Sequence, residues 1–580
     1  MSRNDIDQRD NREPLTTAKN DLPPPAVEVP RFMGRNIPPL DRLLIRLIPP
    51  TLIIGVLVWV LLQPAAAAET ISQLRTFVTG RFTWLFILYS VFTVAVCIWL
   101  STSKVGRIRL GGPKAKPEHS KFAWYSMLFA CGQGIGLIFW SVAEPIMLRD
   151  ENPVIPAADG QGAAEGAIVW TYFHWGLTAW AMYCAVAVCL AYSHHNLGKT
   201  LTFREATVDI LPRWSQRGAG VIVELLAIIA TVLGLATSFG FAALQFTSGL
   251  ASFTGLSSTP MIWLMVIAIF AGITCISAIV GISKGMARIS SLNSILSIVL
   301  VAGVLIFGPT LYIISMISQT FGSFMANFVN MSLWTDAGIT ANPLASWQDS
   351  WNGWWTVFIW CWVIAFSPFV AGFIARISRG RTIREFVLGV TVIPTLIVMI
   401  WVGVIGASAI YYDDQTNRAV SNAVGEDTSA GLFAMLEHLP WVGTILMVVA
   451  TILVATYYVT SLDSGIYALS EFVSAPHKSG PVFRVVLVLS IGTVATVLLT
   501  LGGTAVVDTV QTGTIIGAFP FSFVIILMII NLIRRLIKRD KAIKQLEKDI
   551  NNPDPSLTFV PDPDGTQALR APQDRGSMEQ

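Results

Sequence analysis

Apolar stretches long enough to cross a lipid bilayer recur along the chain from about residue 43 to residue 533. A helix needs about 20 apolar residues to cross the hydrocarbon core, and within that core every backbone amide must find its partner inside the protein. Charged residues make up 13% of the chain, against about 25% in ordinary soluble proteins. The sequence therefore predicts an all-helical protein that crosses the membrane many times.

Polar breaks divide the apolar region into twelve predicted transmembrane spans. The spans cover residues 43–63, 83–102, 122–147, 167–192, 219–249, 260–281, 293–318, 353–376, 384–411, 440–471, 483–502 and 509–533. We expect a cytoplasmic tail at 1–40, a transmembrane domain at 41–535, and a basic helix with a disordered tail at 536–580. The basic helix fits either contact with anionic membrane lipid or ordinary anchoring of the last span.

The charges between the spans predict the orientation of the chain. With the N-terminus inside, the cytoplasmic loops carry 18 Lys and Arg residues, and the external loops carry four, Arg75, Arg81, Arg149 and Arg418. This asymmetry follows the positive-inside rule, and residues 1–36 lack the apolar core of a signal peptide. Both termini are predicted to be cytoplasmic, and the loop 319–352, which lacks Lys and Arg, is expected at the outer interface.

Two classes of function are not expected. All six cysteines lie inside apolar segments without metal spacing, so disulfides and zinc sites are not expected. The short loops contain no nucleophile–base pair. We expect neither an enzyme nor a protein that binds nucleic acid.

A glycine-rich run interrupts the third span. Gly132, Gly134 and Gly136 fall within five residues, and each glycine in a helix costs about 1 kcal/mol relative to alanine. Unwound backbone at membrane depth is tolerated where it lines a cavity. The run predicts a binding site near the membrane centre, although a close helix crossing explains it equally well.

Aromatic residues gather in the fourth and eighth spans. Trp175, Trp180 and Tyr183 share one broad face at 100° per residue, and Trp362 and Phe366 are four residues apart on another. Aromatic faces stabilise a quaternary ammonium group by about 2 kcal/mol or more when it is desolvated. The alternative is ordinary packing against helices or lipid.

Polar residues in three spans are further candidates. The Thr460 and Ser461 hydroxyls are oxygen ligands that sodium accepts, but such hydroxyls commonly bond to their own backbone. Asp463 is an intramembrane acid, which is usually functional or paired. His174 is expected chiefly as a packing residue, and Glu144 is expected close to the outer interface.

Together these motifs resemble the betaine/choline/carnitine transporter family over about residues 40–535. The matching strings are Gly132-Gln-Gly-Ile-Gly136 before Glu144-Pro145, Trp175-x4-Trp180-x2-Tyr183, Phe366-Ser-Pro-Phe369 before Arg376-Ile-Ser-Arg-Gly-Arg, and Thr460-Ser461-x-Asp463-Ser464. The resemblance implies a LeuT-type fold with two inverted five-helix repeats, spans 3–7 and 8–12, and two additional N-terminal helices. It also implies a homotrimer in a bacterial-type cytoplasmic (inner) membrane.

The resemblance further implies transport of a small onium osmolyte or zwitterion, such as glycine betaine or choline, by sodium-coupled symport with alternating access. No cofactor is needed apart from Na⁺ as the coupling ion. The substrate-binding residues that it implies are Trp175, Trp180, Tyr183, Trp362, Phe366, Gly132, Gln133, Gly134 and Ser238. It implies one sodium site at Ala130, Gln133, Tyr457, Thr460 and Ser461, and a second at Thr231 and Phe369.

The chain departs from the family pattern at four positions. Val363 and Phe366 stand where tryptophans are usual, and the loss of a ring removes about 1–2 kcal/mol of cation recognition. Gln133 adds an amide, and Leu235 removes a hydroxyl from the second sodium site. A sulfonium, sulfonate or ectoine-like substrate, or sodium-independent exchange, is therefore an alternative. From another class, a membrane sensor or channel is also an alternative.

Overall fold

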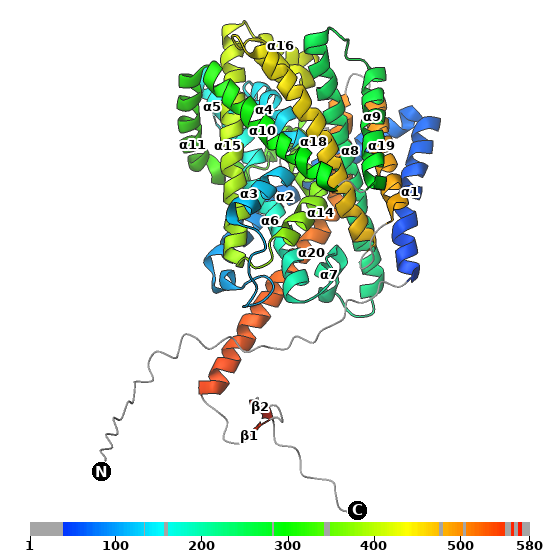
Figure 1. The fold of residues 1–580 in the computed structure, drawn as a ribbon, viewed down its shortest axis with the longest axis vertical. Coiled ribbons are helices and arrows are strands. Elements are labelled where there is room, and N and C mark those ends of the chain that lie inside the picture. Colours follow the sequence, from blue (N-terminus) through cyan, green and yellow to red (C-terminus); the bar gives the residue numbers. More distant parts are fainter. Residues whose placement is uncertain are drawn as a thin grey trace, which may run out of the picture. The chain divides into compact units, whose positions relative to one another are not determined.

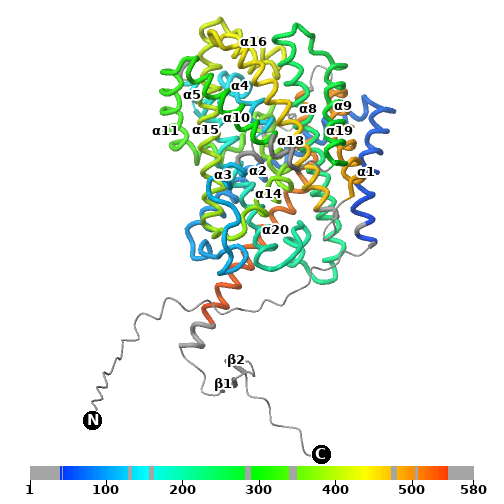
Figure 2. Tube along the Cα trace, viewed as in Figure 1, coloured from blue at the N-terminus to red at the C-terminus, as the bar shows by residue number. Residues whose placement is uncertain are grey.

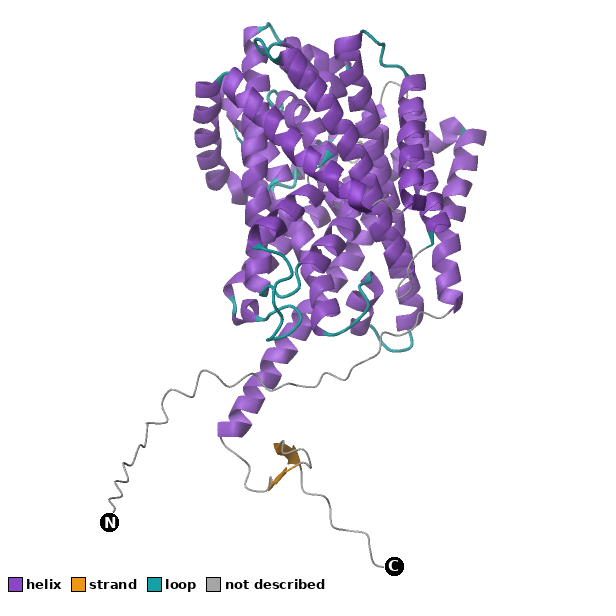
Figure 3. Cartoon of the chain, viewed as in Figure 1, coloured by secondary structure: helices purple, strands orange, loops and turns teal. Residues whose placement is uncertain are grey.

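The computed structural model describes residues 39–132, 134–155, 160–280, 283–340, 349–474, 480–502, 506–551, 558–561 and 567–570. The chain forms two units, one of Phe32–Ile533 and one of Met1–Arg31 with Arg534–Gln580. The described part of the first unit is helical throughout, apart from turns and loops (Figure 3). This confirms the predicted all-helical class.

Eleven helical segments in the described part are long and apolar enough to cross a membrane. Nine of the predicted spans correspond to single long helices, and a tenth, the eighth span, is preceded by one short turn of helix, α13 (Trp351–Trp354). These ten long helices are α1 (Pro39–Leu62), α2 (Pro64–Thr102), α8 (Gln216–Thr254), α9 (Pro260–Val280), α10 (Ser283–Phe307), α14 (Thr356–Ile377), α15 (Ile383–Gln415), α18 (Gly443–Ser474), α19 (Pro481–Gly502) and α20 (Val506–Asn551).

The third and fourth spans are each broken in the middle. The third consists of α3 (Lys121–Gly132) and α4 (Ile135–Leu148), so the predicted break at the glycine-rich run is confirmed. The fourth consists of α5 (Gly160–Trp175) and α6 (Leu177–Ala191), followed by a π-helical turn at Tyr192–Asn196. A Cβ atom on Gly176 would lie 2.5 Å from the Tyr172 carbonyl oxygen, which explains why glycine occupies this second break.

The predicted end of the seventh span, at residue 318, is wrong. Helix α10 ends at Phe307, and a separate helix, α11 (Thr310–Leu333), fills much of the predicted outer loop. Pro309 at the junction has no amide hydrogen to donate to the preceding turn, so the first helix cannot continue through it. The external loop predicted before residue 83 is likewise helical, because α2 already begins at Pro64.

Short elements connect the long helices. They are η1 (Lys104–Arg107), α7 (Phe203–Thr207), η3 (Val208–Ile210), α12 (Ala337–Thr340), α16 (Ala419–Glu426), η5 (Thr428–Ala430) and α17 (Gly431–Glu437). In the second unit, β1 (Thr558–Pro561) pairs antiparallel with β2 (Gln567–Arg570), Thr558 standing opposite Arg570. The rest of the tail predicted to be disordered lies outside the described residues.

The core of the first unit lies around α6 and α14. In the most apolar window of Gly162–Asn196, 94% of the residues are buried, and 89% are buried in that of Trp351–Ile377, against 17% for Leu43–Leu62 in α1. Helix α6 packs on α14, and α8 packs on α18 (Figures 1 and 2). Helix α4 contacts α5, α8, α15 and α18. The broken third span therefore ends among the most buried helices.

Candidate functional site

The N-terminus of α4 is exposed by the break in the third span. Gly134 caps the helix with φ −149° and ψ −126°, outside the helical region. The Ile138 amide donates to the Gly134 carbonyl at 3.3 Å. The backbone amides before Ile138, in the first turn of α4, have no carbonyl acceptor within the helix. Such an end carries partial positive charge and favours an anionic group.

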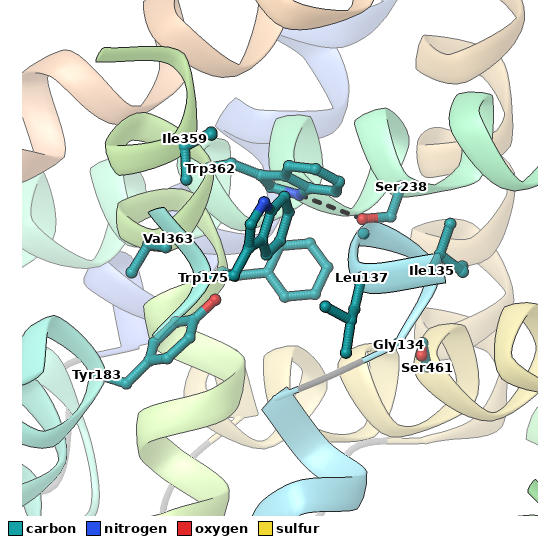
Figure 4. A pocket seen from close by; sticks show the side chains of 12 residues that line it. Gly134, Ile135, Leu137, Trp175, Tyr183, Ser238, Ile359, Trp362, Val363 and Ser461 are labelled. Atoms are coloured by element: carbon teal, nitrogen blue, oxygen red, sulfur yellow. Dashed lines mark hydrogen bonds between the residues drawn. The ribbon is translucent and has the colours of Figure 1, made fainter. Parts of the chain in front are cut away.

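A pocket opens at this helix end and is lined by five segments that are far apart in the sequence. They are the start of α4, the α5–α6 segment, α8, α14 and α18. The lining residues are Gly134, Ile135, Gly136, Leu137, Trp175, Tyr183, Ser238, Ile359, Trp362, Val363, Phe366 and Ser461 (Figure 4). The structure thus brings together seven of the residues predicted to bind substrate or sodium.

Aromatic rings form one side of the pocket. The rings of Trp175 and Trp362 meet edge to face, with centroids 5.6 Å apart and planes at 82° (Figure 4). Trp362 meets Phe366 at 6.3 Å and 84°, and its indole Nε1–H donates to the Ser238 hydroxyl at 3.3 Å. Several ring faces and edges therefore converge on one small volume, as recognition of an organic cation requires.

Trp180 does not line this pocket among the described residues. It is fully buried, and its ring packs edge to face on Tyr183 with centroids 5.8 Å apart. The break at Gly176 explains the difference, because the helical phase of 100° per residue does not carry from Trp175 across a broken turn. Trp180 therefore contacts a residue that lines the pocket without lining it itself.

Two buried ionisable residues contact the pocket's aromatic side. Glu144 and His174 are both fully buried, with His174 Nδ1 2.6 Å from Glu144 Oε1. The Trp175 indole Nε1–H donates to Glu144 Oε2 at 2.6 Å. Glu144 is therefore paired inside the protein, and its expected position close to the outer interface stays a prediction. The sequence signal for this pairing is the presence of an acidic residue inside an apolar stretch, because such a residue is usually functional or paired.

The predicted sodium ligands of α18 contact polar residues of α10. The Thr460 hydroxyl donates to the Thr456 carbonyl at 2.9 Å and accepts from Asn293 Nδ2 at 3.1 Å. The Tyr457 hydroxyl lies 3.2 Å from that of Ser297. Ser461 faces the α4 break, since a Cβ atom on Gly134 would lie 3.3 Å from its Oγ.

The remaining residues predicted to bind substrate or sodium are not among the described residues that line the pocket. Gly132 is the last residue of α3 and Ala130 lies in its final turn, whereas Gln133 lies outside the described residues. Thr231 and Phe369 are buried, and neither lines the described pocket.

Asp463 in α18 is the remaining intramembrane acid that the sequence singles out. It accepts from the Ser277 hydroxyl of α9 at 2.8 Å, so this acid is paired.

Comparisons with known proteins identify the family of the chain. Residues 44–541 match the profile of the betaine/carnitine/choline family transporters. The chain is 37% identical to glycine betaine transporter 1 of Vibrio parahaemolyticus, over 82% of this chain and 90% of that protein. It is 35% identical to the glycine betaine transporter OpuD of Bacillus subtilis, over 84% and 93%.

Two further similarities differ in strength. An ectoine/hydroxyectoine transporter of Virgibacillus pantothenticus is 34% identical over 82% of this chain and 92% of that protein. A structure of a Na⁺-coupled sialic acid symporter matches 73% of this chain and 83% of that chain, with 16% identity and a TM-score of 0.38. Because this similarity is weak, the helix arrangement of the symporter is not assigned to this chain.

The extent of the family match settles the broad class of protein. It covers most of the chain, including every segment that lines the pocket. The members and the relatives are transporters, which decides against an enzyme. This multi-pass membrane protein belongs to the betaine/carnitine/choline family of transporters.

Proposed function

We propose that the chain imports a small zwitterionic onium osmolyte, glycine betaine or a close relative, by sodium-coupled symport. The observation that carries this proposal is the meeting of the α4 N-terminus with the rings of Trp175 and Trp362 in one buried pocket. An onium group cannot accept a hydrogen bond and is stabilised by ring faces. A carboxylate is stabilised by free helix amides. The pocket therefore offers a partner to each end of a zwitterion.

Alternating access between two inverted repeats, spans 3–7 and 8–12 of twelve, completes the proposal. The helix contacts support it because they recur when the repeats are exchanged. Helix α8 packs on α14 and α18 packs on α4; α8 also packs on α19, and α18 packs on α9. In the proposed repeats, α4, α8 and α9 of the first correspond to α14, α18 and α19 of the second. Each of these contacts therefore has an equivalent contact between the corresponding helices. Rocking of one repeat against the other would open the pocket to each side in turn.

Sodium is proposed to bind beside the break, at Ser461 and Thr460 of α18 with backbone oxygens of the third span. The position of Ser461 next to Gly134 supports this site. The second site, at Thr231 and Phe369, lacks the hydroxyl that Leu235 replaces. We therefore propose that at least one sodium ion, bound at the first site, is coupled to transport.

The assembly and orientation are also proposals. We expect a homotrimer with both termini cytoplasmic in a bacterial inner membrane. The exposed apolar residues of α11, Leu311, Ile314, Met325 and Val329, support a face that contacts lipid or another copy. Native mass spectrometry in lipid tests the trimer, and labelling of cysteines introduced at the termini tests the orientation.

Uptake of labelled glycine betaine into proteoliposomes tests the function. We expect uptake to require an inward sodium gradient, and Trp362→Ala to weaken apparent affinity about tenfold through the loss of a pocket ring. Trp84→Ala is the matched control, because Trp84 is 52% exposed on α2. Equal uptake when potassium replaces sodium would contradict the coupling and support exchange.

A second substrate class has a specific observation in its favour. Val363 lines the pocket where the family places a tryptophan, which leaves a less aromatic wall, and one relative is named for ectoine and hydroxyectoine. Competition of glycine betaine uptake by ectoine, choline and a sulfonium analogue separates the classes. Stronger competition by ectoine than by unlabelled glycine betaine would favour the second class.

A further inference from the structure

The carboxylate of Glu144 is shared between two side chains of α5. Its Oε2 accepts from the Trp175 indole at 2.6 Å, and its Oε1 lies 2.6 Å from His174 Nδ1. The other imidazole nitrogen, Nε2, lies 3.0 Å from the Thr356 hydroxyl at the start of α14. Glu144, His174 and Thr356 are all buried. The network therefore joins three separate segments around one indole ring.

The chemistry of these groups fixes the direction of the key contact. An indole N–H can only donate, so Glu144 Oε2 is an acceptor whatever the protonation of His174. A buried acid without partners would be strongly unfavourable, and here both oxygens have a partner. Trp175 is the member of this network that lines the pocket.

We infer that Glu144 is a positioning residue for onium recognition, holding the Trp175 ring against the pocket through its indole N–H. This inference rests on the proposed function. A hydrogen bond to a carboxylate fixes the ring plane, and an anion at the indole N–H makes the ring face more negative. Both effects strengthen attraction to an organic cation. His174 holds the carboxylate in place from its other oxygen.

The space around the ring supports this assignment. A Cβ atom on Gly136 would lie 2.9 Å from Trp175 Cη2 and 2.9 Å from Trp362 Cη2. The ring is therefore held closely against the α4 backbone, and a small rotation about its side-chain torsions would change the pocket. Glu144 and Gly136 belong to the same helix, so α4 contacts both the edge and the nitrogen of this indole.

A double-mutant cycle tests the inference by calorimetric binding of glycine betaine to purified protein. Glu144→Gln keeps an acceptor oxygen but removes the charge, and Trp175→Phe keeps a ring but removes the N–H. We expect each to weaken binding about tenfold, with the double variant no weaker than the weaker single variant. Glu165→Gln, at a half-buried position of α5 beside Gln319 and outside the pocket lining, is the matched control and should bind as wild type.

Separate outcomes distinguish the inference from a purely structural role. Multiplying losses in the double variant, or wild-type binding by Glu144→Gln, would overturn the inference. If Glu144→Gln does not fold, Glu144→Asp keeps the charge but withdraws the oxygens, and it should also weaken binding while maximal uptake at saturating substrate is retained. Wild-type affinity in Glu144→Asp would likewise overturn the inference. A wild-type protein that binds no onium compound would instead contradict the proposed function.

Discussion

Gly136 sets how closely the α4 backbone approaches the two tryptophans. A methyl group there would meet Trp175 and Trp362 ring atoms at 2.9 Å. Overpacking of this kind costs about 1–3 kcal/mol, so we expect Gly136→Ala to weaken substrate binding about tenfold. Binding calorimetry measures the change. Gly272→Ala in α9, where a Cβ atom has open space, should leave affinity unchanged, and an equal loss in both variants would contradict the prediction.

Residue by residue, the sequence predicts the rings better than the polar network. Ring chemistry, which is visible in the sequence, predicts Trp175, Tyr183 and Trp362, and all three line the pocket. Trp180, placed beside them by helical phase across the break at Gly176, does not line it. The pairing of Glu144 could not be predicted, because its partners, His174 and Trp175, lie some thirty positions away in another helix. Only tertiary structure joins residues at that separation.

Among the elements, the C-terminal end of α4 is tied to α15 by charged side chains. Arg149 lies 2.5 Å from Asp414 and 3.5 Å from Asp413. Asp413 is fully buried and also accepts from the Ser421 backbone amide at 2.7 Å and the Ser421 hydroxyl at 2.6 Å. This cluster fixes one end of α4 while the other end lines the pocket.

Removal of the buried acid should destabilise this junction. Asp413→Ala leaves Arg149 without its buried partner and Ser421 without an acceptor, which costs about 3 kcal/mol. We expect a clearly lower unfolding temperature in detergent by thermal-shift measurement. Asp414→Ala, whose side chain is 46% exposed, should have a much smaller effect. Equal effects of the two variants would show that burial does not matter here.

Asp150 and Arg418 make a more exposed pair at the same junction. The hydrogen bond from Arg418 lowers the pKa of Asp150 below its ordinary value of 3.8. A carboxyl group with a lowered pKa stabilises the fold above its ordinary pKa and loses that contribution as the pH falls through the lowered value. Because the pair is exposed, the effect is at most about 1 kcal/mol. Asp150→Asn should therefore lower the unfolding temperature slightly at pH 7 and by less at pH 3, as thermal-shift measurements at the two pH values would show.

The lengths of elements were predicted less well than their existence. Hydropathy located every described helix that is long and apolar enough to cross a membrane. It extended the seventh span through Gly308-Pro309 and began the second span too late. Apolar character does not distinguish a crossing helix from one such as α11, which exposes apolar side chains along its length. The proline was the local signal that the helix ends, and it outweighs continuous hydropathy.

At the scale of the whole molecule, Arg75 joins the beginning and the end of the first unit. Its fully buried guanidinium donates to the Asp508 carbonyl and the Thr512 hydroxyl, each at 3.0 Å, and to Gln511 Oε1 at 3.0 Å. The sequence predicts Arg75 in an external loop, whereas the structure places it within α2, which begins at Pro64. Helix α2 is therefore linked to α20.

Loss of Arg75 should weaken the whole bundle. Arg75→Ala removes the donor to Gln511 Oε1 and to the Thr512 hydroxyl, and each unsatisfied buried acceptor costs about 1–3 kcal/mol. We expect a large drop in unfolding temperature and in the yield of folded protein by size-exclusion chromatography. Arg81→Ala, on an exposed position of the same helix, should leave both unchanged. A stable, fully active Arg75→Ala protein would contradict this role.

The length of α4 has an electrical consequence. The helix has 14 residues, which at 1.5 Å per residue is about 21 Å, and the charged Arg149 and Asp150 follow its far end. In a hydrocarbon core about 30 Å thick, the pocket then lies up to roughly two thirds of the way through the membrane from that end. A cation arriving from there has crossed a similar fraction of the voltage, about 1.5 kcal/mol per 100 mV. Ion affinity itself, and not only the rate of turnover, should therefore vary with membrane potential.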